Sequence, residues 1–166
     1  RAGEMTFTTL DGAARQLDPE MMMICDGDKP VAVAGIMGGQ ISEVSHQTTR
    51  VLLEVATWNG VNILRTSRKL GLRSDASTRF EKQLHPELAI RAQRIASALM
   101  VEVCGAKLVP GTIDVAAEIP EPHRLELRTE RVQSLLGMPI ESKLCSEYLE
   151  RLDFEVSGKG KKLKAT

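Results

Sequence analysis

The sequence predicts a mixed α/β protein in two parts, and three observations support this fold class. Short runs in which apolar and polar residues alternate, as in residues 5–9, are typical of half-buried strands. Longer stretches repeat apolar residues every three or four positions, as in residues 86–103, which indicates helices. A proline-containing stretch at residues 118–122 separates the last 44 or so residues from the rest.

The strands expected before residue 60 are short and separated by turn residues. Residues 5–9 alternate, and residues 22–25 and 31–36 flank a turn rich in Asp and Gly, so these two runs are expected to pair as a hairpin. Residues 50–57 alternate again and are expected to form a further strand. Two more strands are expected further along the chain, at residues 107–109 and 112–115.

The helices expected in this first part begin and end at recognisable residues. Asn59 can cap a helix over residues 61–70, which Gly71 would end. Ser74 and Asp75 each have the side chain of a helix cap, so a second helix is expected just after them. The longest helix is expected from Pro86 to about Val103.

We place the domain boundary at the prolines, with a first domain at residues 1–118, a linker at 119–123 and a second unit at 124–166. The second unit is expected to be the beginning of a small, mainly helical domain that the sequence truncates. Its expected elements are a strand at 124–127, a helix that Thr129 caps and Gly137 ends, a helix at 141–152, and strands at 154–156 and 161–164. Because the chain begins with Arg1 and not Met, we interpret it as a piece of a longer protein.

The charge balance excludes binding that depends on a strong overall field. The formal net charge is +0, so any contact with nucleic acid has to use local cationic patches. The best candidates are four residues around the first helix and a lysine-rich run at residues 159–164. Solvated surface faces are the alternative interpretation of both groups. The four helix residues are Arg65, Arg68, Lys69 and Arg73.

No metal site, disulfide framework or membrane segment is expected. The 3 cysteines lie in apolar segments without a C-x-x-C spacing, so buried free thiols in a reducing cytoplasm are expected. No two histidines have the spacing of a metal site. No apolar run is long enough to cross a bilayer, and the start of the chain has no signal-peptide pattern.

A glycine-rich turn follows the apolar run at residues 31–36. Gly35, Gly38 and Gly39 have no side chains, so a ligand could approach their backbone closely. The spacing matches neither a phosphate-binding loop nor the dinucleotide fingerprint. A tight turn without a ligand is the alternative interpretation.

Glu54 is the most specific chemical signal in the sequence. On the expected strand it shares a face with Leu52 and Ala56, so its carboxylate is expected to face a pocket. A pocket carboxylate that accepts a hydrogen bond from a ligand hydroxyl discriminates strongly against ligands that lack the hydroxyl. The alternative is a solvent-facing residue at the end of a strand.

Three segments together resemble a known family. Gly35-Ile-Met-Gly-Gly39, Val51-Leu-Leu-Glu54 and the segment from Gly71 to Glu81 occur in the order and spacing of the editing module of bacterial phenylalanine–tRNA ligase beta subunits. The likeness extends from about Phe7 to the linker. The sequence after the linker resembles the start of the next small, winged-helix-like domain of that subunit. Three motifs in register make this resemblance specific.

The resemblance implies a three-layer α/β editing domain that hydrolyses tyrosine wrongly esterified to the phenylalanine tRNA. Glu54 matches the acid that recognises the tyrosine hydroxyl, and Gly35 and Gly38 match the floor of the pocket. Ser74 and Ala76 match positions that line the pocket and limit its size. Ester hydrolysis is expected to use a positioned water and not a protein nucleophile.

The family also implies partners and cofactors. The beta subunit pairs with a catalytic alpha subunit in a cytoplasmic α2β2 ligase that binds tRNA(Phe), and ATP and Mg²⁺ serve the ligase reaction outside these residues. Ser74 stands where the family commonly has threonine, and Trp58 where it has phenylalanine. The editing histidine and asparagine of the family lie upstream of Arg1, so the catalytic groups are unknown and the isolated fragment lacks part of the pocket. The alternatives are a non-catalytic scaffold that holds tRNA or subunits, and a stand-alone relative that acts on another ligand.

Overall fold

The computed structural model describes residues 5–116, 119–121 and 123–166. The chain forms two compact units, Arg1–Val115 and Ala116–Thr166, and each is described by itself. The expected linker at 119–123 includes residue 122, and the expected first domain ends at residues 117–118, all of which lie outside the described residues. The boundary drawn from the prolines therefore stays a prediction.

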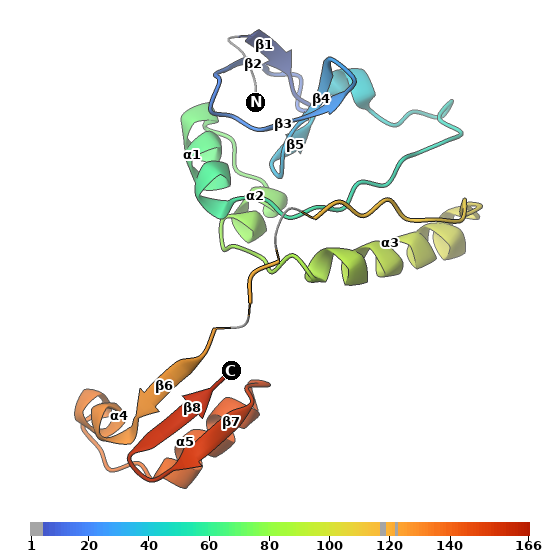
Figure 1. Ribbon diagram of the computed structural model, residues 1–166. Coiled ribbons are helices and arrows are strands. Elements are labelled where there is room, and N and C mark those ends of the chain that lie inside the picture. Colours follow the sequence, from blue (N-terminus) through green and yellow to red (C-terminus); the bar gives the residue numbers. More distant parts are fainter. Residues whose placement is uncertain (1–4, 117–118, 122) are drawn as a thin grey trace. The chain divides into compact units, whose positions relative to one another are not determined.

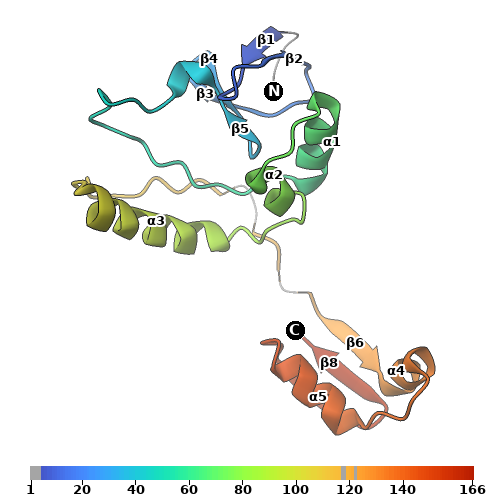
Figure 2. The same ribbon diagram turned by 180° about the vertical axis from the view of Figure 1, so that it is seen from behind.

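The first unit contains two small antiparallel sheets (Figures 1 and 2). One pairs β1 (Met5–Thr8) with β2 (Ala14–Leu17). The other has the order β3-β4-β5, formed by Met23–Asp26, Lys29–Val33 and Met37–Gly38. An isolated bridge between Thr9 and Gly39 connects the two sheets. The first strand and the hairpin predicted from the sequence are thus confirmed.

Three α-helices follow, together with the short 3-10 helix η1 (Gln40–Ser42). They are α1 (Gly60–Leu70), α2 (Asp75–Phe80) and α3 (Leu88–Cys104). The side chain of Asn59 caps α1 by accepting a hydrogen bond from the backbone N–H of Asn62 at 3.0 Å, and Gly71 ends it in the left-handed conformation at φ 60°. All three helices lie where the sequence predicts them.

The core of the first unit lies between the two sheets and α1. Ile63 of α1 is 1% exposed and belongs to the same apolar cluster as Phe7 of β1 and Val33 of β4. Because these residues come from three separate elements, burying them stabilises the arrangement of the two sheets and α1. The buried members of the cluster are Phe7, Leu17, Met21, Val33, Ile36, Ile63 and Leu72.

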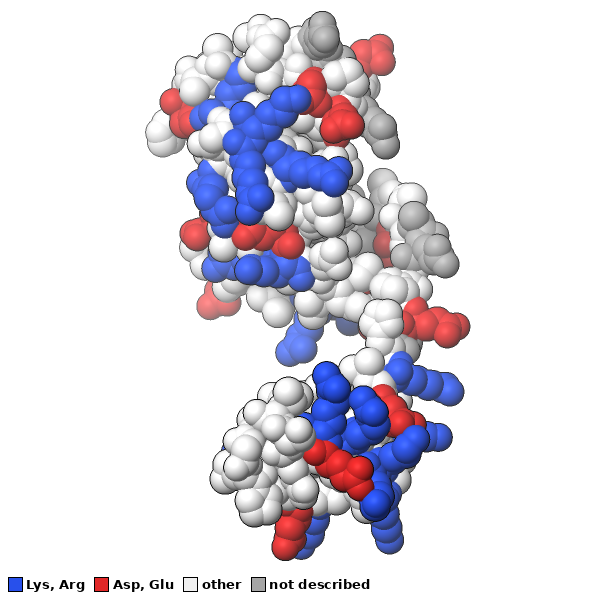
Figure 3. Space-filling view, turned by 90° about the vertical axis from the view of Figure 1, so that its left-hand side faces the viewer, with Lys and Arg blue, Asp and Glu red and all other residues white. Residues whose placement is uncertain are grey.

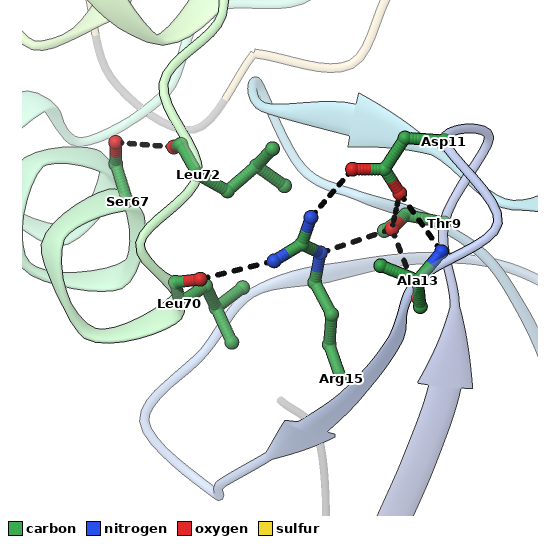
Figure 4. Close-up of polar contacts among 7 residues, drawn as sticks. All are labelled: Thr9, Asp11, Ala13, Arg15, Ser67, Leu70 and Leu72. Carbon is green, nitrogen blue, oxygen red and sulfur yellow. Dashed lines mark hydrogen bonds and ion pairs between the residues drawn. The ribbon is translucent and has the colours of Figure 1, made fainter.

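A half-buried arginine also connects the β1–β2 hairpin to the end of α1 (Figure 4). Arg15 donates one hydrogen bond to the carbonyl oxygen of Leu70 at 3.0 Å and another to the hydroxyl of Thr9, also at 3.0 Å. Its guanidinium pairs with Asp11 at 2.5 Å. A cation at a helix C-terminus satisfies carbonyls that lack a partner within the helix. The hairpin therefore holds the point at which the chain leaves α1.

The strands predicted at residues 50–57, 107–109 and 112–115 are wrong, because none of these segments joins a sheet in the described part of the chain. Residues 50–58 run as an extended, irregular trace between η1 and α1 (Figure 1). Leu52 is 91% exposed and Ile113 is 90% exposed. An alternating pattern forms a strand only where a partner strand can accept its backbone hydrogen bonds, and none of the three segments has such a partner among the described residues.

The second unit is also mixed, with two helices and one antiparallel sheet of order β6-β8-β7. Thr129 begins α4 but does not cap it: Arg128 is the cap residue, and the Thr129 hydroxyl donates to the carbonyl oxygen of Gly160 at 3.1 Å. The final hairpin starts two residues later than predicted. The elements are β6 (Leu125–Arg128), α4 (Thr129–Leu136), α5 (Ser142–Glu150), β7 (Val156–Lys159) and β8 (Lys162–Ala165). The predicted fold class is confirmed.

Two of the three cysteines are exposed, contrary to the expectation that all three are buried. Cys25 and Cys104 lie at the surface, whereas Cys145 is buried, and all three are free thiols. No three His, Cys, Asp or Glu side chains within the described residues lie together as metal ligands would. Among the same residues, no helix has the length and apolar character that crossing a bilayer requires.

Candidate functional site

The first unit contains an open hollow of about 430 Å³ at the surface beside the glycine-rich turn. Its walls come from the β3-β4-β5 sheet, from residues 54–58 and from α2. Four of the five residues that the sequence analysis assigned to the pocket line it: Gly35, Gly38, Glu54 and Ala76. The other lining residues are Ile24, Ala32, Val33, Ile36, Met37, Val55, Ala56, Trp58 and Phe80.

The floor of this hollow is a tight turn that requires glycine at one position. The backbone N–H of Ile36 donates to the carbonyl oxygen of Val33 at 3.0 Å, which closes a turn between β4 and β5. Gly35 occupies this turn at φ 65°, in the left-handed region. A Cβ there would lie 2.7 Å from Cδ1 of Trp58 and 3.0 Å from Cδ1 of Ile63. The backbone of Gly35 is thus packed closely against the aromatic wall.

Two aromatic rings and one small residue form the sides of the hollow. Trp58 precedes α1, and Phe80 is the last residue of α2. Ala76 lies four residues before Phe80, so the two residues share one face of α2. Aromatic walls together with a small residue suit a flat aromatic ligand, because ring edges and faces pack favourably together.

Glu54 is the only ionisable residue among those that line the hollow. The residue is solvent-exposed overall, so water reaches it at the mouth of the hollow. Desolvation by the surrounding protein nevertheless raises the pKa of its carboxyl group above the usual value of 4.5. The predicted strand around Glu54 is absent, but the carboxylate still lies on the lining of a hollow. A hydroxyl donor bound there would supply the carboxylate with a hydrogen bond in place of the water that the surrounding protein displaces.

Ser74 does not line the hollow, although the resemblance places it in the pocket. Its hydroxyl donates to the carbonyl oxygen of Ile36 at 2.7 Å and accepts from the backbone N–H of Ser77 at 3.1 Å. Ser77 in turn caps Ser74, because its hydroxyl accepts from the backbone N–H of Ser74 at 2.9 Å. The Ser74 hydroxyl is therefore bonded to backbone groups where α2 begins.

The four candidate cations for tRNA contact differ in their surroundings. Lys69 forms an ion pair with Asp18, and Arg73 pairs with Glu81 at 2.9 Å. Arg65 and Arg68 are exposed on α1. Lysine and arginine side chains gather on the face of the first unit where α1 lies (Figure 3). A patch of this kind can contact a phosphate backbone even though the net charge is zero.

A second, smaller hollow of about 180 Å³ lies between α1 and the loop after β2. It is lined mainly by polar and charged residues, and the Lys69–Asp18 ion pair crosses it. Charges that already neutralise each other offer little to a ligand. We therefore take the hollow around Glu54 as the candidate site. The residues of the smaller hollow are Asp18, Glu20, Met21, Asn62, Arg65, Thr66 and Lys69.

Sequence reasoning missed the two aromatic residues of the site. Trp58 is the only tryptophan of the chain and lies four residues after Glu54. Phe80 lies one helical turn after Ala76. The spacing of Phe80 from Ala76 was a usable signal, since residues four apart on a helix lie on one side. Nothing local to Trp58 shows that it meets Gly35, because that contact depends on tertiary packing.

Comparison with known proteins places this site in a family. The model of the B3/4 domain matches residues 1–105, which is more than half of the chain. The chain therefore belongs to the B3/4 domain family, and the candidate site lies wholly within the matched residues.

Individual relatives show which proteins of known name the chain is similar to. The chain is 50% identical over 154 residues to the phenylalanine–tRNA ligase beta subunit of Moorella thermoacetica, which covers 93% of this chain and 19% of the relative. It is 43% identical over 157 residues to the beta subunit of Clostridium acetobutylicum, with 95% and 20% covered. The beta subunit of Carboxydothermus hydrogenoformans is 42% identical over 163 residues, with 98% and 20% covered. The resemblance to this subunit is confirmed, and the chain spans about a fifth of the length of these curated relatives.

Proposed function

We propose that this chain forms part of the editing site of a phenylalanine–tRNA ligase beta subunit, where tyrosine wrongly attached to tRNA(Phe) is hydrolysed. The observation that carries the proposal is the single carboxylate of Glu54 on an otherwise uncharged hollow with aromatic walls. The identity with beta subunits along nearly the whole chain supports the same conclusion.

Recognition of tyrosine follows from the chemistry of the lining. The ring of the amino acid packs between Trp58 and Phe80, and its phenol hydroxyl donates a hydrogen bond to Glu54. Phenylalanine has the same ring without the hydroxyl, so it makes no hydrogen bond to the carboxylate. Hydrogen bonds to charged groups contribute about 1.5–3 kcal/mol, which corresponds to roughly 10- to 150-fold in selectivity.

The reaction itself is hydrolysis of the ester between the amino acid and the tRNA. The oxygen of a water molecule attacks the ester carbonyl carbon, and the bond from that carbon to the ribose oxygen breaks. Tyrosine leaves as the free acid, and the tRNA regains its terminal hydroxyl. In this chain the residues that line the hollow hold the side chain of the substrate, and we assign no residue of the chain as the group that activates the water.

The remaining parts of the ligase are assigned outside this chain. We propose an alpha subunit as partner in an α2β2 assembly in the cytoplasm, with ATP and Mg²⁺ used in the ligase reaction there. The lining of the candidate site does not suit magnesium, because Glu54 is its only carboxylate. The tRNA is proposed to contact the exposed cations Arg65 and Arg68 on α1.

A chimeric ligase tests the proposal without assumptions about the rest of the polypeptide. This chain replaces the matched segment in the beta subunit of Moorella thermoacetica, which is then assembled with the alpha subunit of that organism. Deacylation is measured with tyrosyl-tRNA(Phe) and phenylalanyl-tRNA(Phe). The chimera is expected to hydrolyse the tyrosyl ester with a higher kcat/KM than the phenylalanyl ester.

Substitution of Glu54 separates recognition from general activity. Glu54→Ala is expected to reduce the preference for the tyrosyl ester by roughly tenfold or more, because the acceptor of the phenol hydrogen bond is lost. Glu102→Ala, an exposed residue of α3, is the matched control and is expected to leave the preference unchanged. An unchanged preference in Glu54→Ala would remove the role of Glu54. Absence of deacylation in the unsubstituted chimera would instead favour a non-catalytic module that holds tRNA or subunits.

A further inference from the structure

We propose that Ser74 is a positioning residue whose hydroxyl ties the α2 wall of the hollow to its glycine-rich floor and thereby sets the width of the site. We call this hydrogen bond between Ser74 and Ile36 the tie. The effect of the tie on substrate selectivity rests on the proposed function, whereas the existence of the tie does not. This role differs from direct contact with the substrate, which the resemblance implies for this position.

The tie joins the α2 wall to the floor, which are far apart in the sequence. The Ser74 hydroxyl donates to the carbonyl oxygen of Ile36 at 2.7 Å, across 38 residues of sequence. Ile36 lines the hollow from the floor, and Ala76 lines it from α2, two residues after Ser74. Within the described residues, this is the only hydrogen bond between residues 74–81 and residues 33–39. A movement of the start of α2 away from Ile36 must therefore lengthen or break it.

The hydroxyl has no proton left for a substrate. A serine hydroxyl has one proton to donate, and Ile36 receives it. The oxygen also accepts from the backbone N–H of Ser77, whose side chain is fully buried. This reciprocal cap fixes the first turn of α2 relative to Ser74. The position of α2 thus depends on the same oxygen atom that is bonded to the floor.

The connector between α1 and α2, residues 71–74, is also held by hydrogen bonds at its α1 end. Arg15 bonds the carbonyl oxygen of Leu70 at 3.0 Å, and the Ser67 hydroxyl bonds that of Leu72 at 2.6 Å (Figure 4). Both anchors lie on the α1 side of the connector. Ser74 supplies the anchor on the side of the hollow.

Three substitutions separate the tie from the helix cap. Ser74→Thr keeps both the proton donor and the acceptor. Ser74→Asp keeps an acceptor for the Ser77 N–H but has no proton to donate to Ile36, because an ionised carboxylate only accepts hydrogen bonds. Ser74→Ala loses both. A role as a cap alone predicts that Asp behaves like Ser, whereas the tie predicts that Asp behaves like Ala.

The first readout is hydrogen exchange in the chimeric ligase, and it does not depend on activity. Peptides that cover residues 33–39 are expected to exchange at least about threefold faster in both Ser74→Asp and Ser74→Ala, and unchanged in Ser74→Thr, because a lost hydrogen bond of about 1 kcal/mol corresponds to roughly fivefold in local opening. Peptides that cover residues 75–80 are expected to change strongly only in Ser74→Ala. Exchange in the β1–β2 hairpin serves as the control for global folding.

The second readout is the kinetics of deacylation. Ser74→Asp and Ser74→Ala are expected to lower kcat/KM for the tyrosyl ester by on the order of tenfold and to reduce the preference over the phenylalanyl ester, because a misplaced ring no longer meets Glu54. Ser74→Thr is expected to keep the wild-type values of both kcat/KM and this preference.

Wild-type exchange at residues 33–39 in Ser74→Asp would overturn the tie. Faster exchange with unchanged kinetics in an active chimera would overturn the positioning role. An inactive wild-type chimera would overturn only the proposed function, and the exchange data would still decide on the tie.

Discussion

Residues 5–40 and residues 41–58 of the first unit differ in how firmly the fold holds them. The first region contains five strands, and its apolar side chains Leu17, Met21 and Val33 are at most 2% exposed. The second contains no strand and only the end of η1, and Ile41 and Leu52 are 78% and 91% exposed. Both regions contribute to the candidate site: the floor comes from the first and Glu54 from the second. The site therefore combines a floor beside the buried core with an acid that follows a largely exposed stretch of chain.

The largest expected difference between the two regions is in the free energy of unfolding that is lost when a leucine side chain is truncated. Leu17→Ala is expected to lower the free energy of unfolding by about 2–5 kcal/mol, because it leaves a cavity in the core. Leu52→Ala is expected to change it by less than about 0.5 kcal/mol, because the side chain contacts mainly water. Urea unfolding followed by the fluorescence of Trp58, the only tryptophan, measures both. Similar losses in the two variants would show that residues 41–58 are packed as firmly as the core.

A glycine pair sharpens the comparison at the floor itself. Gly35→Ala is expected to lower the free energy of unfolding by about 2–4 kcal/mol. The alanine has to adopt a left-handed conformation, and its Cβ meets Trp58 and Ile63. Gly71→Ala has a similar φ of 60° but no atom within 4 Å of the added Cβ, so only about 1 kcal/mol of backbone strain is expected. The same urea titration applies. Equal costs would mean that the aromatic wall does not press on the floor.

The smallest expected effect concerns the ionisation of Glu54. Its pKa is raised by desolvation, so the folded protein binds this proton more tightly than the unfolded chain does. Stability is then lost as the pH rises from about the usual 4.5 through the raised pKa, and it is constant above that window. Glu54→Gln removes this loss, so the variant is expected to gain slightly on the wild type across the window. Thermal unfolding at a series of pH values measures the gain, and a difference that does not vary with pH would contradict it.

The sequence predicted the elements whose signals are local. Asn59 and Gly71 bound α1 through a cap and a left-handed residue, and both features depend only on neighbouring backbone. The hairpin of β3 and β4 was predictable because its partner strands adjoin one turn. The strand expected at residues 50–57 is absent, because alternation identifies a candidate strand but not its partner.

The site was predictable only in part for a similar reason. Gly35, Gly38, Glu54 and Ala76 were found from turn chemistry, a lone carboxylate and the family resemblance, and all four lie on one hollow. The role of Ser74 depends on a hydrogen bond to Ile36, 38 residues away. The contact between Trp58 and the Gly35 turn is equally non-local. No pattern within a short window contains such contacts.

Recognition of a phenol by Glu54 is the central claim, and the most direct measurement is the ratio of deacylation rates for tyrosyl and phenylalanyl esters in the chimeric ligase before and after Glu54→Ala. The account predicts a ratio well above one that falls by roughly tenfold or more in the variant. A ratio that is the same in both proteins would contradict it.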